Sequence, residues 1–142
     1  MTISEQGLNL IKRYEGCVLK AYRCPAGVLT IGYGHTGGVR EGQVITRKEA
    51  DEYLKRDVKA VETCISTAVQ SRLSQNQFDA LCSFTFNVGC GNFLRSTLLK
   101  KIKVNPSDPA IRAEFAKWVH AKSVVLPGLV KRRKEEADLY FR

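Results

Sequence analysis

A glutamate at the end of a predicted first helix is followed, fifteen residues later, by a threonine that opens a glycine-rich segment. The acid is Glu15, and the later segment reads Thr30-Ile31-Gly32-Tyr33-Gly34-His35-Thr36. A carboxyl held between a helix end and a twisted hairpin is partly withdrawn from water, which raises its pKa toward the range of a general acid. A lone glutamate is more often a solvated helix-end carboxylate, so this interpretation depends on what surrounds Glu15.

The residues between these two anchors predict a β-hairpin. Residues 18–23 are typical of a short strand, residues 24–27 of a turn and residues 28–34 of the returning strand. Pro25 suits the second position of a tight turn, and Gly27 can take the positive φ that such a turn needs. A hairpin after the helix would bring Glu15, position 24 and Thr30 toward one cleft.

Three capping boxes mark predicted helix starts. Thr2 with Glu5 opens the first helix, which Gly16 ends. Thr46 with Glu49 opens a long helix that runs to about residue 69, and a third short strand is expected before it at residues 39–45. Residues 74–77 open the next helix in the same way, and this helix carries the most apolar stretch of the chain. Beyond it, the pattern predicts helices over residues 92–104, 110–121 and 129–141.

Composition limits the class of protein. The chain has 142 residues, 44% of them hydrophobic, and a net charge of 23 − 14 = +9. This supports one folded domain with a basic surface that favours polyanions such as nucleic acid, anionic membrane or bacterial wall polymers. No run of 18 apolar residues exists, and the first fifteen residues are too polar for a signal peptide, so we expect a soluble chain. Two histidines and the absence of a Cys-x-x-Cys spacing argue against a metal site.

These motifs together give the chain a strong similarity to one family. Glu15 is followed by eight residues, by a variable residue at position 24, by five more residues and then by Thr30, which precedes Ile31-Gly32-Tyr33-Gly34-His35-Thr36. This arrangement resembles that of the phage-type lysozymes, or endolysins. Other segments resemble that family in the same order along almost the full length: Gln77-Phe78-Asp79-Ala80-Leu81, Ser83-Phe84, Phe86-Asn87-Val88-Gly89, Ser96-Thr97-Leu98-Leu99 and Gly128-Leu129-Val130-Lys131-Arg132-Arg133.

The resemblance implies an α+β, mostly helical two-lobe lysozyme fold. A small antiparallel β-sheet would lie in the N-terminal lobe, and a long helix would join the lobes. The single domain 1–142 would divide into an N-terminal lobe of about residues 13–60 and a C-terminal helical lobe of about residues 61–142 together with the first helix, 1–12.

The resemblance also implies the site residues, with one departure. Glu15 would protonate the glycosidic oxygen, and Thr30 would help to position the attacking water. Where the family usually has aspartate, this chain has Cys24, which can act as the base only as a thiolate, whereas a free thiol has a pKa of about 8.5. Some relatives also carry cysteine here, so we interpret Cys24 as a catalytic variant, with an inert turn cysteine as the alternative. Substrate contacts are expected from Thr36, Phe86 and Thr97, although an aromatic residue at the spacing of Phe86 is more often part of the core.

Five cysteines are present, an odd number. Cysteine-bearing relatives suggest a structural bridge between Cys64 and Cys90, and Cys82 lies on an apolar helical face as expected for a buried free thiol. A bond between Cys17 and Cys24 would occupy the catalytic sulfur, which suggests redox gating of activity. The alternative is two unrelated reduced thiols.

Two further features have a structural and a functional interpretation. His35 looks structural in the family, tied to a carboxylate of the second half, rather than catalytic. The basic run 131–134 is predicted to be a solvated helix face balanced by Glu135 and Glu136, and it could also attract the anionic wall.

The sequence therefore predicts a muramidase that hydrolyses the β-1,4 bond between N-acetylmuramic acid and N-acetylglucosamine in bacterial peptidoglycan, with no cofactor and no metal. The expected partner is peptidoglycan, without nucleic acid or a membrane segment, and the chain is expected to be a monomer. It would accumulate in the host cytoplasm and act on the wall in the periplasm after release, or be exported if a native anchor precedes it. The rival functions are a lytic transglycosylase and a non-catalytic wall-binding domain.

Overall fold

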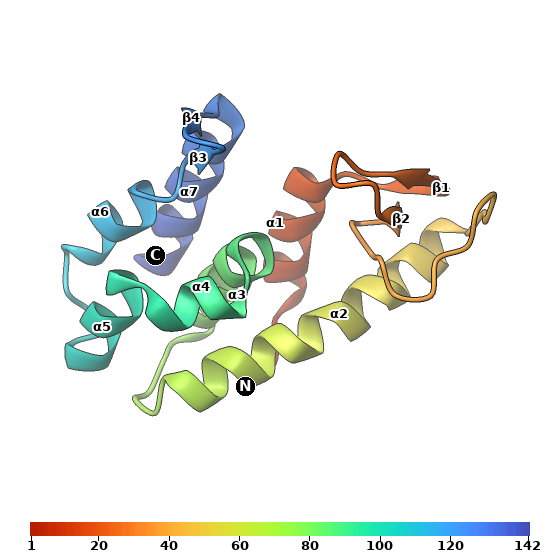
Figure 1. The fold of residues 1–142 in the computed structure, drawn as a ribbon. Helices are drawn as coiled ribbons and strands as arrows, with labels where there is room; N and C mark the ends of the chain where they lie inside the picture. Colours follow the sequence, from red (N-terminus) through yellow and green to blue (C-terminus); the bar gives the residue numbers. More distant parts are fainter.

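The computed structural model describes residues 1–142 and contains seven helices and two small antiparallel sheets. Their order is α1 (Glu5–Glu15), β1 (Val18–Arg23), β2 (Leu29–Gly32), α2 (Arg47–Ala68), α3 (Gln75–Val88), α4 (Cys90–Arg95), α5 (Thr97–Val104), α6 (Ile111–Ala116), β3 (His120–Ala121), β4 (Val124–Val125) and α7 (Pro127–Tyr140). The β1–β2 hairpin and the start of α2 lie at one end of the molecule, and α3 to α7 form the other end (Figure 1). The predicted α+β class is confirmed.

The predicted hairpin is confirmed, whereas the third strand is not. β1 pairs with β2 so that Tyr22 faces Thr30, and Gly27 in the turn has a φ of 79°. Residues 39–45 do not form a strand. Only one isolated bridge joins Val44 to Lys20, because a turn at Gly42, with a φ of 76°, interrupts this segment.

Two of the three predicted capping boxes are present. Thr46 opens α2 and Ser74 opens α3, each with the reciprocal hydrogen bonds of a capping box. The prediction for Thr2 is wrong, because the cap of α1 is Ser4, whose Oγ accepts the N–H of Gly7. The backbone before α1 is fixed instead by carboxylates from other helices: Glu62 accepts the N–H of Ile3 and Asp79 accepts the N–H of Ser4.

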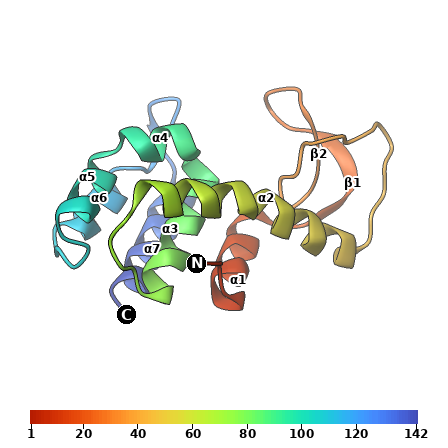
Figure 2. The same ribbon diagram turned by 90° about the horizontal axis from the view of Figure 1, so that it is seen from below.

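The long helix α2 connects the two ends of the molecule. It runs from the loop after β2 to the helices around α3 (Figure 2), and it contacts both β2 and α3. With 22 residues it is the longest helix, as predicted. None of the helices combines the length and the hydropathy that crossing a bilayer would require.

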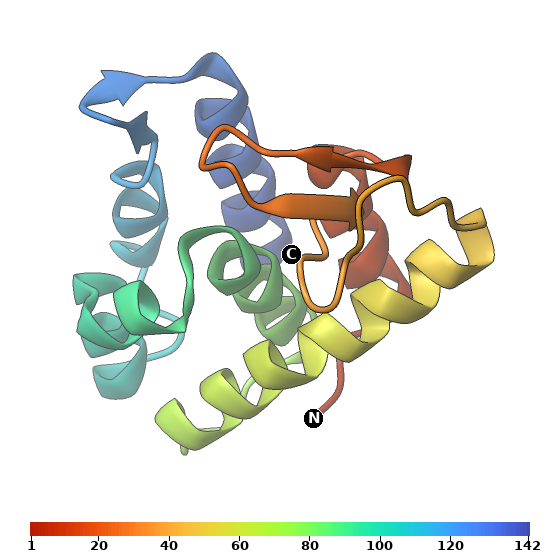
Figure 3. The same cartoon turned by 45° about the vertical axis from the view of Figure 1, so that its right-hand side comes forward.

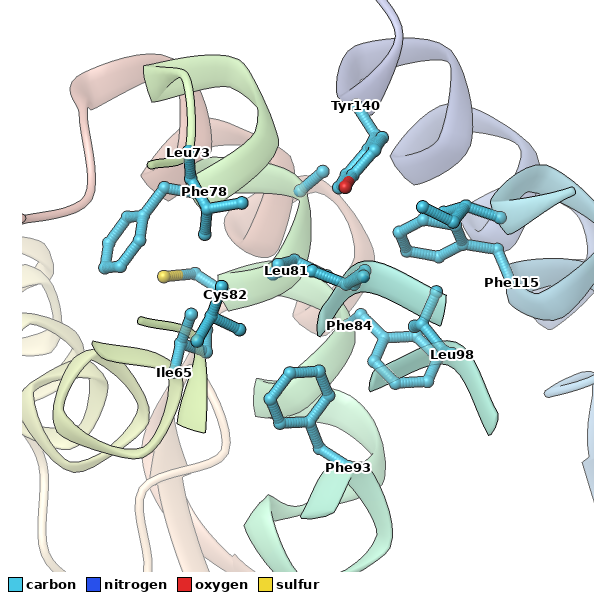
Figure 4. Close-up of a cluster of buried hydrophobic side chains, with 14 of the residues drawn as sticks. Ile65, Leu73, Phe78, Leu81, Cys82, Phe84, Phe93, Leu98, Phe115 and Tyr140 are labelled. Carbon is cyan, nitrogen blue, oxygen red and sulfur yellow. The ribbon is translucent and has the colours of Figure 1, made fainter. Parts of the chain in front are cut away.

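The buried hydrophobic residues form two clusters. The smaller cluster lies under the hairpin and includes Leu8, Ile11, Ile31, Tyr33, Ile45, Ala50, Leu54 and Val58. The larger one, 19 residues around α3, includes Phe78, Leu81, Phe84 and Phe93 (Figure 4). α1 contributes Leu8 and Ile11 to the smaller cluster and Leu10 to the larger one. Two clusters are what a two-lobe division requires; the boundaries at residues 13–60 and 61–142 stay a prediction.

The helices between α3 and α7 are shorter than the sequence predicts. The expected helix 92–104 is split at Ser96, which caps α5 by accepting the N–H of Leu99 and also donates its hydroxyl to the carbonyl of Phe93. The expected helix 110–121 ends at Ala116. The chain then enters the β3–β4 hairpin, whose two-residue loop, Lys122 and Ser123, has φ values of 49° and 68°. The last helix begins two residues earlier than expected, at Pro127.

One disulfide joins the end of α2 to the start of α4. It links Cys64 to Cys90, 26 residues apart, as the resemblance implied. Cys17, Cys24 and Cys82 are free, and Cys82 is buried beside Leu81 and Phe78 in the larger cluster (Figure 4). The prediction of a buried free thiol at Cys82 is therefore confirmed, and burial raises the pKa of that thiol.

Candidate functional site

Glu15 is the last residue of α1. Gly16 ends the helix with a φ of 68°, a conformation that favours glycine, and donates its N–H to the carbonyl of Lys12. The Glu15 side chain is 22% exposed, and its Oε1 would lie 3.5 Å from a Cβ added at Gly34. The carboxyl is therefore partly buried against the segment that follows β2. In Figure 3 the hairpin lies across α1, with its turn on the side of α7.

A buried arginine from the C-terminal helix holds the Glu15 carboxylate. Arg132 Nη1 lies 2.6 Å from Glu15 Oε2, and the Arg132 side chain is only 3% exposed. Its guanidinium also lies over the ring of Tyr14, 5.5 Å from the centroid. This contact, which joins residues 117 positions apart, fixes the direction in which Glu15 points.

Cys24 and Thr30 lie together at the far end of the hairpin. Hydrogen bonds from the backbone N–H groups of Val28 and Ala26, followed by a smaller contribution from the Thr30 hydroxyl, lower the pKa of the Cys24 thiol. The thiol is free and partly exposed, whereas Thr30 is only 4% exposed and its hydroxyl donates to the carbonyl of Val28 at 2.9 Å. The backbone of the turn therefore favours the thiolate form of Cys24.

Cys17 lies at the opposite end of β1 from Cys24. It packs against the smaller cluster and contacts Tyr33, whose pKa is raised by burial first and by Cys17 second. The ends of β1, Val18 and Arg23, pair with Gly32 and Leu29, which are three residues apart, so this irregular strand holds its ends about 10 Å apart at the rise of an extended chain. A disulfide requires Cα atoms within about 7 Å of each other. A Cys17–Cys24 bond is therefore incompatible with an intact β1.

His35 pairs with a carboxylate, although not with the one that was expected. Its Nδ1 lies 2.9 Å from Asp57 Oδ2, its Nε2 lies 2.8 Å from the carbonyl of Gly37, and its ring stacks on Tyr53. The prediction of a carboxylate from the second half is wrong, because Asp57 belongs to α2. The pair ties the glycine-rich segment to the long helix.

The residues predicted to bind substrate lie on different elements. Thr36 and Thr97 are exposed, after β2 and at the start of α5. Phe86 is partly buried against the smaller cluster, the position that its core alternative predicted. Their contact with substrate stays a prediction.

The basic run on α7 differs most from the sequence prediction. Arg132, Arg133 and Glu136 are buried rather than solvated, with side chains 3%, 1% and 0% exposed. Glu136 Oε2 lies 3.2 Å from Arg132 Nε, and its Oε1 lies 2.9 Å from Arg133 Nε. Burial raises the pKa of the Glu136 carboxyl, which the charges of Arg133 and Arg132 oppose, and burial lowers the pKa of Arg133.

Sequence reasoning missed this ion cluster, although one signal was available. Arg132 and Arg133 stand four and three residues before Glu136, so all three share one helix face. Ala137 and Tyr140, which belong to the larger cluster, stand four and seven residues after Arg133 and so lie on the same face. Charges that share a face with core residues are paired and buried rather than solvated. No group of three or more metal-ligating side chains lies together in the chain.

Comparisons with known proteins give matches over almost the whole chain. Residues 12–136 match the family model described as phage lysozyme. The chain is 49% identical to the endolysin of Acyrthosiphon pisum secondary endosymbiont phage 1 over 99% of this chain and 98% of that protein. It is 44% identical to the endolysin of Bacillus phage PZA over 99% of this chain, but it spans only 55% of that relative. Among solved structures, the muramidase domain of SpmX from Asticaccaulis excentricus superimposes with a TM-score of 0.94 at 34% identity, covering 99% of this chain and 98% of that one.

Proposed function

The chain belongs to the phage lysozyme family, and we propose that Glu15, Cys24 and Thr30 carry out its glycoside hydrolysis. It is a peptidoglycan-hydrolysing endolysin, a muramidase that cuts the β-1,4 bond between N-acetylmuramic acid and N-acetylglucosamine. The three residues come from α1 and the hairpin that follows it.

Glu15 acts as the general acid. As the bond between the sugar C1 and the glycosidic oxygen breaks, the proton of the Glu15 carboxyl passes to that oxygen, which leaves as an alcohol. Because Arg132 Nη1 holds the carboxylate at 2.6 Å, Glu15 must leave this contact in part to carry a proton. Binding of the sugar chain supplies the displacement.

Cys24 acts as the base on the opposite face of the sugar. Its thiolate takes a proton from a water molecule while the water oxygen forms a bond to C1, and Thr30 positions that water through its hydroxyl. The product has inverted configuration, as expected when a water molecule attacks directly. The Cys24 thiol returns its proton to solvent, and Glu15 regains one.

The observation that carries this proposal is the placement of Cys24 beside Thr30 at the turn of the hairpin, where the backbone of Val28 and Ala26 lowers the pKa of its thiol. A sulfur that is stabilised as a thiolate can replace the usual aspartate, whereas an inert turn cysteine does not need these donors.

The mass of the released muropeptides tests the reaction type. Hydrolysis adds one water molecule for each bond cut, so we expect products with reducing ends. A lytic transglycosylase uses one acid and no activated water, and products that are one water lighter, with anhydromuramic ends, would replace our proposal with that reaction.

We also propose the setting in which the enzyme works. The chain acts as a monomer on the bacterial wall, reaching it from the host cytoplasm or by export. Its net charge of +9 attracts it to the anionic wall polymers, and this attraction weakens as salt screens the charges.

A further inference from the structure

Glu136 lies beneath the arginine that holds Glu15. It stands on α7, and its side chain is fully buried. Its Oε2 accepts the hydroxyl of Ser83 at 2.6 Å and lies 3.2 Å from Arg132 Nε. Its Oε1 lies 2.9 Å from Arg133 Nε. Oε2 is therefore held in a fixed direction by hydrogen bonds from α3 and α7, whereas Oε1 is paired with Arg133 through charge alone.

Arg132 connects this buried carboxylate to the candidate acid. One edge of its guanidinium points to Glu136 through Nε, and the other points to Glu15 through Nη1 at 2.6 Å. Its Nη2 donates to the backbone carbonyl of Ser83 at 3.1 Å. A planar guanidinium held on two sides has little rotational freedom, so the direction of the Glu15 contact is set by Glu136 and Ser83. α1, α3 and α7, which supply these groups, lie side by side in Figure 1.

The charges in this cluster balance. Arg132 and Arg133 carry two positive charges, and Glu136 and Glu15 carry two negative ones. The other groups that face the cluster are neutral: Ser83 and Asn87 from α3, with Asn87 accepting from Arg133 Nη2 at 2.7 Å, and the ring of Tyr14 from α1. Without the charge of Glu136, one positive charge beside Glu15 would be uncompensated.

We propose that Glu136 is a positioning residue that acts through Arg132 to set the orientation and the charge environment of Glu15. The proposal rests on the role proposed above for Glu15 as the proton donor. Glu136 touches neither substrate nor reacting atoms. It keeps Arg132 in place, and its negative charge offsets the positive charge that Arg132 exerts on Glu15.

The substitution Glu136→Gln tests the proposal, because it removes the charge and keeps the size. We expect kcat/KM on purified peptidoglycan to fall by about tenfold or more, since small displacements of a catalytic group can cost up to about a hundredfold. We also expect the alkaline limb of the pH–activity profile to move to lower pH, because one positive charge at the site is no longer compensated.

The matched control is Glu135→Gln, the same change one residue earlier on the same helix. Glu135 pairs with Arg13 and Tyr14 near the surface and does not contact Arg132. This variant should keep the pH profile of the wild type. A Glu136→Gln variant that is equally active at every pH, or that loses the same factor at every pH, would overturn the proposal, since a merely structural role does not move the alkaline limb.

A double variant keeps the test decisive if Glu136→Gln does not fold. In Arg132→Gln/Glu136→Gln both partners are neutral amides, so one positive and one negative charge are removed together and the charges of Arg133 and Glu15 still balance. If Glu136 acts through Arg132, the double variant should match Arg132→Gln within about twofold in kcat/KM. A further tenfold loss would mean that Glu136 acts by another route, and the proposal would be wrong.

The Glu15→Gln variant separates this proposal from the proposed function. An inactive Glu15→Gln with a normal Glu136→Gln overturns only the positioning role. An active Glu15→Gln overturns the assignment of the acid itself.

Discussion

Cys24 stands at the position where the catalytic base is expected, and its chemistry depends on its protonation. A thiol is a weaker acid than a carboxyl group, so only a site that stabilises the thiolate can use it near neutral pH. The structure provides that stabilisation through two backbone N–H groups and the Thr30 hydroxyl. The departure from the usual aspartate is therefore accompanied by a local environment that suits it.

Replacing Cys24 by aspartate should change how the enzyme responds to pH. In the wild type, activity should rise as pH rises through the pKa of the Cys24 thiol, which the turn holds below its ordinary value. An aspartate is ionised above a pH of about 4, so Cys24→Asp should move the acidic limb to lower pH and raise activity several-fold in mildly acid buffer. The pH–rate profile checks this. An unchanged acidic limb would mean that Cys24 is not the base.

The sequence predicts the residues of the site better than the contacts among them. Glu15, Cys24 and Thr30 follow from local spacing around one hairpin. Arg132 could not be found in this way, because its contact with Glu15 joins residues 117 positions apart and depends on how α7 packs against α1 and α3. Without that packing, Arg132 looked like part of a solvated basic face.

At the scale of elements, strand β1 controls whether Cys17 and Cys24 can meet. The intact strand holds its ends about 10 Å apart, so an oxidised form with this bond must lose β1 and with it the paired position of Thr30 on β2. If such a form exists, redox gating works by unfolding the hairpin rather than by blocking the sulfur alone.

Activity measured with and without reductant, in the wild type and in Cys17→Ser, tests this gate. We expect reductant to activate oxidised wild-type enzyme and to leave Cys17→Ser unchanged, because only the wild type can form the bond. Cys24→Ala should lose more activity than Cys17→Ala in reducing buffer. Equal rates in all four wild-type and Cys17→Ser samples would rule the gate out.

The loop of the β3–β4 hairpin has a strained backbone that substitutions can relieve. Lys122 and Ser123 both have positive φ, a conformation that Asn and Gly adopt more readily in two-residue hairpin loops. Lys122→Asn/Ser123→Gly should therefore raise the free energy of unfolding by about 1 kcal/mol. Urea denaturation measures this, and lower stability in the double variant would contradict the account.

The sequence predicts a helix start when the residues that cap it are close in sequence, and it misses a start that depends on residues from other helices. The capping boxes at Thr46 and Ser74 need only residues three apart, so the sequence shows them. The start of α1 depends on Glu62 and Asp79 from other helices, and the break at Ser96 depends on a hydroxyl that bonds to Phe93 and Leu99. Two-residue strands such as β3 and β4 are too short to give a pattern.

At the scale of the whole molecule, the Cys64–Cys90 disulfide fastens α2 to α4. It closes a loop of 26 residues, and the loss of such a link lowers stability by about 3 kcal/mol in the loop-entropy view. Cys64→Ala/Cys90→Ala should show this decrease in denaturant unfolding. Because the bond lies in the larger cluster, away from the hairpin, the variant should keep its activity while it is folded. A variant as stable as the wild type would show that the bond adds nothing.

The two ends of the molecule meet functionally at Glu15. In the proposed mechanism α1 and the hairpin supply the acid and the base, whereas α7 supplies the arginine that directs the acid. The resemblance of separated segments predicted the α+β arrangement, and the long helix followed from its capping box and its apolar stripe. The short elements between α3 and α7 depend on tertiary contacts, which is why they were predicted less well.

The release of reducing ends from purified peptidoglycan by Glu15→Gln tests the central claim most directly. Glutamine keeps the size of the side chain but has no proton to donate, so we predict a rate lower by about a thousandfold with the fold intact. Glu5→Gln, an exposed change at the start of the same helix, is the control and should be fully active. A Glu15→Gln enzyme that cuts peptidoglycan at the wild-type rate would contradict the account.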